Sequence, residues 1–392
     1  MSVNMQSAEV AVIGGGVIGT SIAWHLARRG VRVTLLEQRG LASAASGSSA
    51  GGVRQQGRDL REMPLAIGSI ARWEHLSKEL EADIHYLREG HIQVTEWEDD
   101  IPRMRESIAR QQAAGLDIRL VKGDDLRELV PGITAQALAG TYTANDGHAN
   151  PILTTHAFAS AAIRHGARIM LDTRVTGIER AGGRSRITGL ATTNGPIACD
   201  WLVLAAGAWS PALATDLDID LPITPVGLQM MATAPMPPLL HQVVGALNRH
   251  LSLKQIPSGN YVIGGGWPGD PNLDTNLATP RYTSILGSMI DSFAIFPILR
   301  KAQLERVWVG IEAETIDQVP ILGPVPGIDN LIVATGFTGH GFALSPIVGQ
   351  LMSELIIDGT PSIPINELTF ARFADGINAS VAEPTAPRVR AG

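Results

Sequence analysis

The sequence predicts an α/β fold with two domains, and three observations support this. The chain has 392 residues, more than one hydrophobic core usually serves. Apolar residues make up 45% of it and charged residues 18%, a balance typical of a well-packed globular protein. Its first fifty residues alternate short β-branched runs with a stretch of helical period, which is the pattern of strands and helices around a parallel sheet.

Composition argues against several classes of function. The formal net charge is −7 and no block of lysine or arginine occurs, so we expect no nucleic-acid partner. The one cysteine, Cys199, excludes internal disulfides and cysteine-based metal sites, and we expect it to be buried and inert. No metal site is predicted. The first apolar run is too short for a signal peptide, and no stretch approaches the roughly 18 apolar residues of a membrane span. We therefore expect a cytoplasmic protein.

A glycine-rich turn follows the first expected strand, Val10–Ile13. It reads G-x-G-x-x-G at Gly14, Gly16 and Gly19. In such a turn the first glycine permits a tight bend, the second lets a pyrophosphate approach the backbone, and the third lets helix and strand pack closely. The helix that begins near Val17 and Ile18 presents N–H groups and positive partial charge to phosphates.

The continuation completes a Rossmann-like unit. The helix ends at Gly30, a left-handed C-cap, and a second strand, Val31–Leu36, leads to Glu37. An acid about 20 residues after the glycines accepts hydrogen bonds from an adenosine ribose and disfavours NADP. Gln38 and Arg39 follow in the same part of the predicted site. A lone glycine motif is weak evidence, but the ordered set of elements predicts dinucleotide binding.

The next segment decides between FAD and NAD, which the glycine motif leaves open. Residues 43–52 are small, flexible and rich in hydroxyl and N–H groups. A disordered linker is the alternative interpretation, but it fits poorly directly after a core strand.

Here the chain resembles the D-amino-acid oxidase superfamily, in particular glycine oxidase, sarcosine oxidase and related amine dehydrogenases. Similar segments recur at 173–178, 200–210 and 317–342, and the resemblance spans 8–54, 147–210 and 306–358. It implies an FAD cofactor. Besides the glycine turn and Glu37, the residues it places at FAD are Ser46, Gly47, Ser48, Ser49, Gly51, Gly52, Val175, Ala206, Gly207, Trp209, Gly336, Gly339, His340, Gly341 and Phe342.

If these blocks share one cofactor, the domain that binds it is discontinuous. We predict an FAD-binding domain from 8–85, 148–224 and 311–372, and an α+β substrate domain with a mixed sheet from 86–147 and 225–310. Strand-like runs occur at Ile92–Thr95 and Tyr261–Ile263, and Asn194-Gly195 predicts a hairpin turn. Ser345 and Pro346 predict the start of the last long helix. Residues 373–392 are expected to form a flexible tail.

The resemblance implies that the flavin takes a hydride from the carbon that bears nitrogen, giving an imine that water hydrolyses. No catalytic triad is evident. Family members with Ser-Ser-x-Gly-x-x-Arg place the arginine near the substrate, so Arg54 is a candidate for binding a carboxylate through two hydrogen bonds. A surface arginine is the alternative. Arg58 and Arg61 are weaker candidates.

Two histidines lie in segments of the resemblance. His340, in the flavin loop, could contact the flavin or the substrate amine and titrate near neutral pH, or simply pack the loop. We expect His148 to be structural.

One departure from the glycine oxidase pattern bears on the substrate. There Trp-x-Gly-x is followed by an arginine that binds the carboxylate, whereas Trp308-Val309-Gly310-Ile311 is followed by Glu312. An acid would repel a carboxylate and attract an ammonium group, which argues against simple glycine or D-alanine oxidation. The Trp-x-Gly-x-Glu pattern is similar to that of the family's D-hydroxyproline dehydrogenases and opine-oxidising enzymes, which implies a secondary amine, imino acid or N-substituted amino acid; a salt bridge is the alternative role of Glu312. Gly310 stands where monomeric sarcosine oxidases carry the flavin-linked cysteine, so non-covalent FAD is expected.

Several alternatives stay open from the sequence. The leading hypothesis is an FAD enzyme for a secondary amine or imino acid, either a dehydrogenase that passes electrons to a partner subunit or an oxidase. The others are a simple glycine or D-amino-acid oxidase that makes peroxide, an NAD-dependent dehydrogenase, and a non-catalytic flavin-binding subunit.

Overall fold

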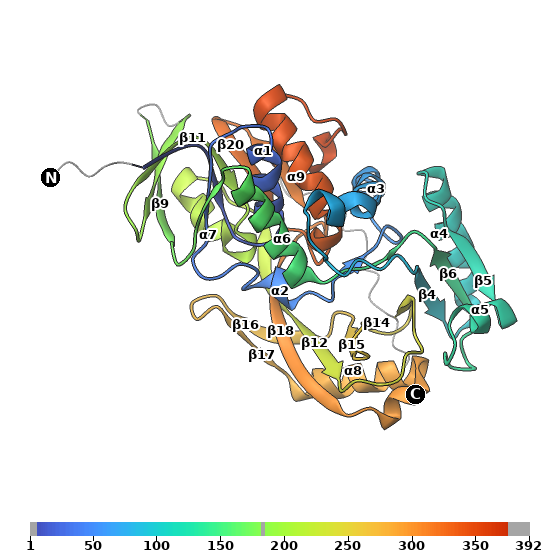
Figure 1. Cartoon of the computed structure of the whole chain (residues 1–392). Coiled ribbons are helices and arrows are strands. Elements are labelled where there is room, and N and C mark those ends of the chain that lie inside the picture. Colours follow the sequence, from blue (N-terminus) through green and yellow to red (C-terminus); the bar gives the residue numbers. More distant parts are fainter. Residues whose placement is uncertain (1–5, 182–184, 375–392) are drawn as a thin grey trace.

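The computed structural model describes residues 6–181 and 185–374, in which two large sheets form the frame of the molecule (Figure 1). The first sheet has the order β19-β20-β11-β1-β2-β8. Its strands are β1 (Gln6–Ile13), β2 (Val33–Leu36), β8 (Arg168–Met170), β11 (Ile197–Leu204), β19 (Ile321–Val325) and β20 (Ile328–Thr335).

Strand β1 lies inside a parallel core of this sheet. It pairs in parallel with β2 and β11, and these pair in parallel with β8 and β20. The inner strands read as continuous apolar runs because both faces of a parallel sheet are covered. A hairpin of β9 (Val175–Arg180) and β10 (Ile187–Thr192) adds to β11. The predicted turn at Asn194-Gly195 is confirmed, with Gly195 at φ +100°.

Helices cover one face of the first sheet. They are α1 (Val17–Ala27), α6 (Pro151–Arg164) and α9 (Gly341–Asp358), with α3 (Met63–Glu79) packed outside α9 (Figure 1). All of α1 is buried, and its Trp24 packs on Phe158 of α6. A Cβ on Gly349 would lie 2.2 Å from the Ser21 hydroxyl, so this glycine permits the close contact of α9 with α1.

The second sheet is mixed, as predicted. Its order is β17-β16-β12-β15-β14-β13-β4-β6-β5, with β18 paired to β12; β13 and β4 are parallel and the other pairs antiparallel. Its strands are β4 (His91–Thr95), β5 (Arg119–Lys122), β6 (Ala139–Thr143), β12 (Ile223–Thr233), β13 (Val243–Ala246), β14 (Ser252–Gln255), β15 (Tyr261–Gly264), β16 (Pro268–Asn272), β17 (Leu277–Pro280) and β18 (Leu304–Thr315).

Helices also pack on the second sheet. Helix α8 (Tyr282–Ile295) and the short α5 (Gly123–Leu129) share an apolar cluster with it, and α4 (Ile101–Ala113) packs beside β5 and β6. Together the two sheets and their helices confirm an α/β fold with a Rossmann-like unit and a second domain of mixed sheet.

A small ribbon connects the two parts. Strand β3 (Gly52–Val53) pairs antiparallel with β7 (Gly147–His148), so the segment after the serine-rich loop lies beside the segment that enters α6. Both segments pass between the sheets in Figure 1.

The start of α9 differs from the prediction. The helix begins at Gly341, so Pro346 lies inside it and Ser345 is no N-cap. A proline there cannot give an N–H to the carbonyl four residues earlier. The Ser345 hydroxyl donates to that carbonyl, of Phe342, at 2.9 Å. The side chain thus replaces the missing backbone hydrogen bond, and the helix continues through the proline.

Two predicted boundaries, the domain limit at 310/311 and the start of the tail at 373, can be compared with the structure. The limit at 310/311 falls inside β18, whose pairing with β12 continues to Thr315 opposite Ile223, so it was placed too early for the second sheet. The remaining domain limits stay predictions. Of the expected tail, Phe373 ends a short 3-10 helix and packs against Phe370, while residues 375–392 lie outside the described part.

Candidate functional site

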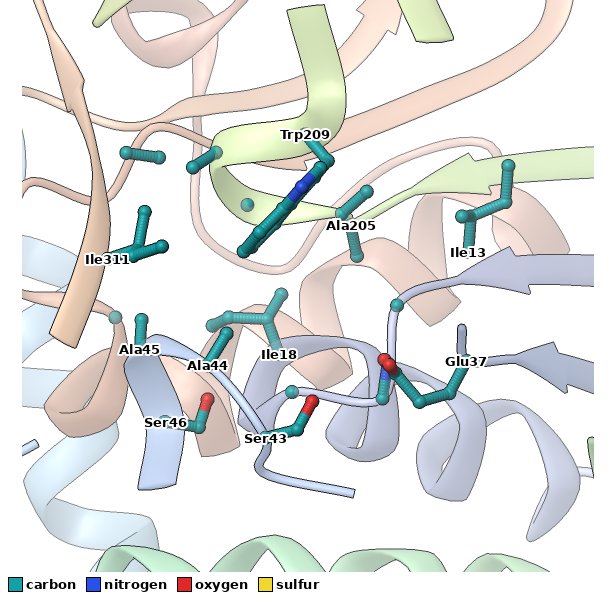
Figure 2. A pocket seen from close by; sticks show the side chains of 18 of the residues that line it. Ile13, Ile18, Glu37, Ser43, Ala44, Ala45, Ser46, Ala205, Trp209 and Ile311 are labelled. Carbon is teal, nitrogen blue, oxygen red and sulfur yellow. The ribbon is translucent and has the colours of Figure 1, made fainter. Parts of the chain in front are cut away.

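A long cavity opens where β1 and β2 end, at the edge that binds ligands in open α/β sheets. A water-sized sphere can reach about 300 Å³ of it, at the lower end of the ~300–1,000 Å³ that is usual for ligand sites. Figure 2 shows Glu37 near one end, Ile311 near the other, and Trp209 across from the segment 43–46. The cavity therefore suits an elongated ligand.

The glycine turn after β1 is built without room for side chains. Gly14 has φ +117°, and a Cβ on it would lie 2.3 Å from the carbonyl oxygen of Ala205. A Cβ on Gly19 would lie 2.0 Å from the carbonyl oxygen of Gly14. Only glycine fits these two positions, because the turn contacts β11 on one side and α1 on the other.

Glu37 fastens the same turn. One carboxylate oxygen accepts from the Gly15 N–H at 2.7 Å and the other from the Arg39 N–H at 2.8 Å. Burial raises the pKa of this carboxyl, and the two N–H donors oppose that rise. Because a carboxylate has about four acceptor positions, Glu37 retains capacity for hydroxyl groups of a ligand in the cavity.

The loop after β2 is tied to the start of α1. Its one-turn helix α2 (Ala45–Ser48) places the Ser46 hydroxyl 2.9 Å from the Val17 N–H, which donates to it. A Cβ on Gly16, the N-cap of α1, would lie 3.0 Å from the same hydroxyl, and no side chain caps the helix there. The positive end of α1 therefore faces the cavity beside a hydroxyl-rich loop.

Most of the predicted cofactor residues line this one cavity although they come from distant segments. They are Gly14, Gly16, Val17, Ile18, Glu37, Gln38, Ser46, Ser49, Val175, Ala206, Gly207, Trp209, Gly336, Gly339, Gly341 and Phe342. The predicted residues that do not line it are Gly19, Arg39, Gly47, Ser48, Gly51, Gly52 and His340.

Several of the predicted residues that do not line the cavity have other roles, which their contacts show. A Cβ on Gly47 would lie 2.0 Å from the carbonyl oxygen of Ala42, so this glycine serves the bend of its own loop. The carbonyl of Ser48 accepts from the Trp308 indole N–H at 3.0 Å and so joins the loop to β18. The Arg39 guanidinium donates to the carbonyl of Thr275 at 2.6 Å.

Sequence reasoning missed part of the lining. Ala212 and Leu213 of α7 (Ser210–Ala214) and Asn276 between β16 and β17 all contribute to it. The segment Thr275-Asn276 is held in place by Arg39, so the second sheet reaches the end of the cavity near Glu37. Nothing in the local pattern around Asn276 indicates this contact, because it depends on a partner 237 residues away.

Glu312 lies at the other end, on β18, and lines the cavity. The Gly339 N–H donates weakly to its carboxylate at 3.4 Å, and no ion pair to an arginine is seen in the described residues. Burial raises the pKa of Glu312 to about 7. The predicted alternative of a salt bridge is therefore wrong, and burial without a counter-charge accounts for the raised pKa.

Next to this end lies a group of buried charges around β3 and α9. The His340 ring contacts Glu62, with Nδ1 at 3.2 Å from Oε2. Burial and then the charge of Arg58 lower the pKa of His340 to about 4, so the expected titration near neutral pH is wrong. Burial raises the pKa of Asp146 to about 6, although Gln55 and Gln56 donate to it.

The two arginines of this group are poorly paired. The Arg54 guanidinium makes no hydrogen bond or ion pair within the described residues, and burial lowers its pKa, opposed by the charges of Asp146 and Glu62. Arg58 donates to the Arg54 carbonyl at 3.3 Å, and its Nη1 is buried without a partner. Burial lowers the pKa of Arg58 to about 9. Both groups are thus placed to bind an anion.

The surroundings of Arg61 and Cys199 indicate that these two residues stabilise the fold. Arg61 forms ion pairs with Asp59 and Asp317. Cys199 is buried, and burial raises the pKa of its thiol to about 12. Within 6–181 and 185–374 no three His, Cys, Asp or Glu side chains are arranged to hold a metal ion. In the same ranges no helix has both the length and the apolar content of a membrane span.

A Rossmann-like turn that opens on a long cavity is the construction of a dinucleotide-binding protein. The family model described as DAO, FAD dependent oxidoreductase, matches residues 9–355. The chain therefore belongs to this family of FAD-dependent oxidoreductases and is an enzyme.

Individual relatives agree with this assignment. Glycine oxidase of Geobacillus kaustophilus is 31% identical over 360 residues, covering 89% of this chain and 92% of the relative. Sarcosine oxidase subunit beta of Rhodobacter capsulatus is 27% identical, with 95% and 91% covered. The crystal structure of L-proline dehydrogenase from P. horikoshii superimposes with a TM-score of 0.89 at 28% identity, covering 95% of this chain and 99% of that one.

Proposed function

We propose that this enzyme oxidises the C–N bond of a small amine or amino acid, preferably a secondary amine, imino acid or N-substituted amino acid that carries a carboxylate. The observation that carries the proposal is the Arg54 guanidinium, which is half-buried next to the cofactor loop with no carboxylate bound to it in the described residues. A partly buried guanidinium without a counter-charge can bind a carboxylate through two hydrogen bonds, so an anionic substrate group is its natural partner.

The cavity residues fit FAD as the cofactor. Glu37 is placed for the ribose, and the turn at Gly14 and Gly16 with the positive end of α1 for the pyrophosphate. Non-covalent attachment is supported because position 310 is glycine and Cys199 does not line the cavity. When bound, FAD supplies the acceptor for a hydride from the carbon that bears nitrogen.

Glu312 is the residue we assign to the substrate nitrogen. Its carboxyl lines the cavity and has a pKa raised to about 7 by burial, so near neutral pH it can either accept a hydrogen bond from an amine or give one. In its ionised form it repels a carboxylate and attracts an ammonium group. Arg54 and Glu312 thus bind opposite charges, which orients an amino acid between them.

The relatives support the substrate class. Glycine oxidase and the sarcosine oxidase beta subunit are named for amino acids, and L-proline dehydrogenase for a cyclic imino acid. One of them is named as a subunit, which supports a partner subunit, and another is named a dehydrogenase, which supports an electron acceptor other than oxygen. Water then hydrolyses the imine product, a step for which we assign no residue of the protein.

The test is anaerobic titration of the purified, flavin-loaded protein with glycine, D-alanine, sarcosine, L-proline and an opine. We expect the flavin absorbance to bleach with the secondary amines at lower concentration than with glycine or D-alanine. Bleaching by glycine or D-alanine first would overturn the substrate preference, and no bleaching by any amine would overturn the activity. Peroxide release in air, compared with reduction of a dye, separates oxidase from dehydrogenase.

A further inference from the structure

A buried lysine faces the cofactor-binding side of the second sheet. On β14, Leu253 belongs to the apolar cluster that also holds Tyr261 and Ile263. Because neighbouring residues of a strand point to opposite faces, Lys254 points the other way, together with its partner Val262. Lys254 is only 5% exposed. Most of its side chain is therefore covered on the face of the sheet that lies away from this apolar cluster.

The ammonium group reaches the loop that precedes Arg54. A Cβ on Gly51 would lie 3.2 Å from Nζ of Lys254 and 2.2 Å from the carbonyl oxygen of Ala149. Gly51 has φ +69°, so the chain makes close contact here at a position that favours glycine. The contact places Nζ beside the start of β3, the short strand that leads to Arg54.

Nothing in the described part of the chain neutralises this charge. No hydrogen bond or ion pair from those residues reaches Nζ, and burial alone lowers the pKa of Lys254 to about 7. Lysine is among the residues that are almost never fully buried unless paired. A ligand that brings an anion would remove this cost.

A second unpartnered group lies close by. His148 on β7 is 2% exposed, and its Nε2 is buried without a hydrogen-bond partner. Burial, and after it the charge of Lys254, lowers the pKa of His148 to about 3, so the ring is neutral. Nζ of Lys254 and Nε2 of His148 thus come from different strands, are close enough for the lysine charge to act on the ring, and have no partner from the described residues.

This place is separate from Arg54. Gly51 and Arg54 lie on either side of the two-residue strand β3. The charge of Arg54 acts on His91 and His340, whereas that of Lys254 acts on His148. Lys254 beside Gly51 and Arg54 are therefore two separate cationic positions, one near each end of β3.

We propose that Lys254 binds a second anionic group of the substrate, so that the preferred substrate is a secondary amine with two carboxylates. This inference rests on the proposed function, in which Arg54 binds the first carboxylate. His148 contributes a hydrogen bond to the same anion through Nε2. A compact amine with one acidic group on each side of the nitrogen spans the two positions.

Two thioether probes test this because sulfur replaces the oxidisable nitrogen. Methylthioacetate carries one carboxylate and thiodiacetate carries two. Calorimetric titration of the flavin-loaded enzyme should show thiodiacetate binding about 10- to 100-fold more tightly, the worth of one charged hydrogen bond. Lys254→Met should remove this preference and leave the affinity for methylthioacetate unchanged. The exposed Lys122→Met is the matched control and should behave as the wild type.

Lys254→Met is expected to fold and to melt no lower than the wild type, because the lysine makes no hydrogen bond that methionine loses. If this variant does not fold, proton uptake by the wild-type enzyme tests the inference. Binding of thiodiacetate at pH 7.5 should be accompanied by uptake of more protons than binding of methylthioacetate, since an anion raises the pKa of Lys254 from about 7. Equal proton uptake would overturn the inference, as would equal affinity for the two probes. Absence of binding by both probes, together with no bleaching by any amine, would instead overturn the proposed function.

Discussion

The Val17 N–H donates a hydrogen bond to the Ser46 hydroxyl at 2.9 Å, across 29 residues of sequence. Ser46 thereby fixes the serine-rich loop to the first turn of α1, and both line the same cavity. Because α1 has no side-chain cap of its own, this one contact serves helix and loop together.

Ser46→Ala should therefore weaken FAD binding and lower the free energy of unfolding of the FAD-free protein by about 1 kcal/mol, the usual net value of such a hydrogen bond. Fluorescence titration with FAD and urea unfolding measure the two effects. Ser43→Ala, in the same loop, leaves the contact with Val17 in place and is the control. Equal effects of both substitutions would contradict the role assigned to Ser46.

Gly14→Ala should abolish uptake of FAD and destabilise the protein by about 2 kcal/mol or more. The residue has φ +117°, and its new Cβ would lie 2.3 Å from the backbone of Ala205. The matched control is Gly40→Ala, where a Cβ meets nothing within 4 Å. Co-purified flavin and melting temperature are the measurements, and a yellow, stable Gly14→Ala protein would refute this account of the turn.

Arg54→Met should raise KM for a carboxylate substrate about 100-fold, because removal of a charged hydrogen-bonding partner from a buried site costs a few kcal/mol. Arg54→Lys should restore little of the loss, since an ammonium group cannot bind a carboxylate through two parallel hydrogen bonds. Steady-state kinetics and flavin content check this. An unchanged KM with full flavin would show that the carboxylate binds elsewhere.

Glu312 should make stability depend on pH. Its folded pKa of about 7 lies above the ordinary value of 4.5, so the folded state holds a proton that the unfolded state has lost in this range. Stability should thus fall as pH rises from about 4.5 to about 7, by at most about 3 kcal/mol, and then level off.

Urea unfolding of the FAD-free protein at pH 5, 6, 7 and 8 measures this dependence. Glu312→Gln serves as the reference, since the amide does not titrate and other groups such as Asp146 act equally in both proteins. A constant difference between the two proteins at all four pH values would exclude a raised pKa at Glu312.

Local sequence patterns were sufficient for the first half of the site. Gly14, Gly19 and Glu37 belong to one strand–turn–helix–strand unit, so their spacing alone predicts their places, although the contact of Gly14 with Ala205 is long-range. The resemblance to a known family located the more distant parts, such as Trp209 and Gly336. The start of α9 could not be predicted from Pro346, because the compensating hydrogen bond from Ser345 is a property of the folded helix.

The charged surroundings of the substrate position could not be predicted in the same way. Glu62 meets His340 across 278 residues, and Asp146 meets Gln55 across 91. Lys254 occurs in a strand that otherwise looks ordinary, and only the approach of Gly51 reveals its burial. Long-range tertiary contacts, which leave no periodic signal in the chain, decide the electrostatics here.

The order of strands in the first sheet has a consequence for synthesis on the ribosome. Its members come from 6–36, 168–204 and 321–335, and α9 follows them. A nascent chain therefore exposes the edge of β11 until β20 emerges, and Gly336 and Phe342 reach the cavity only after the second sheet has been translated. Capture of the cofactor is expected to be a late event, so premature termination before about residue 340 should yield a chain that no supply of flavin can rescue.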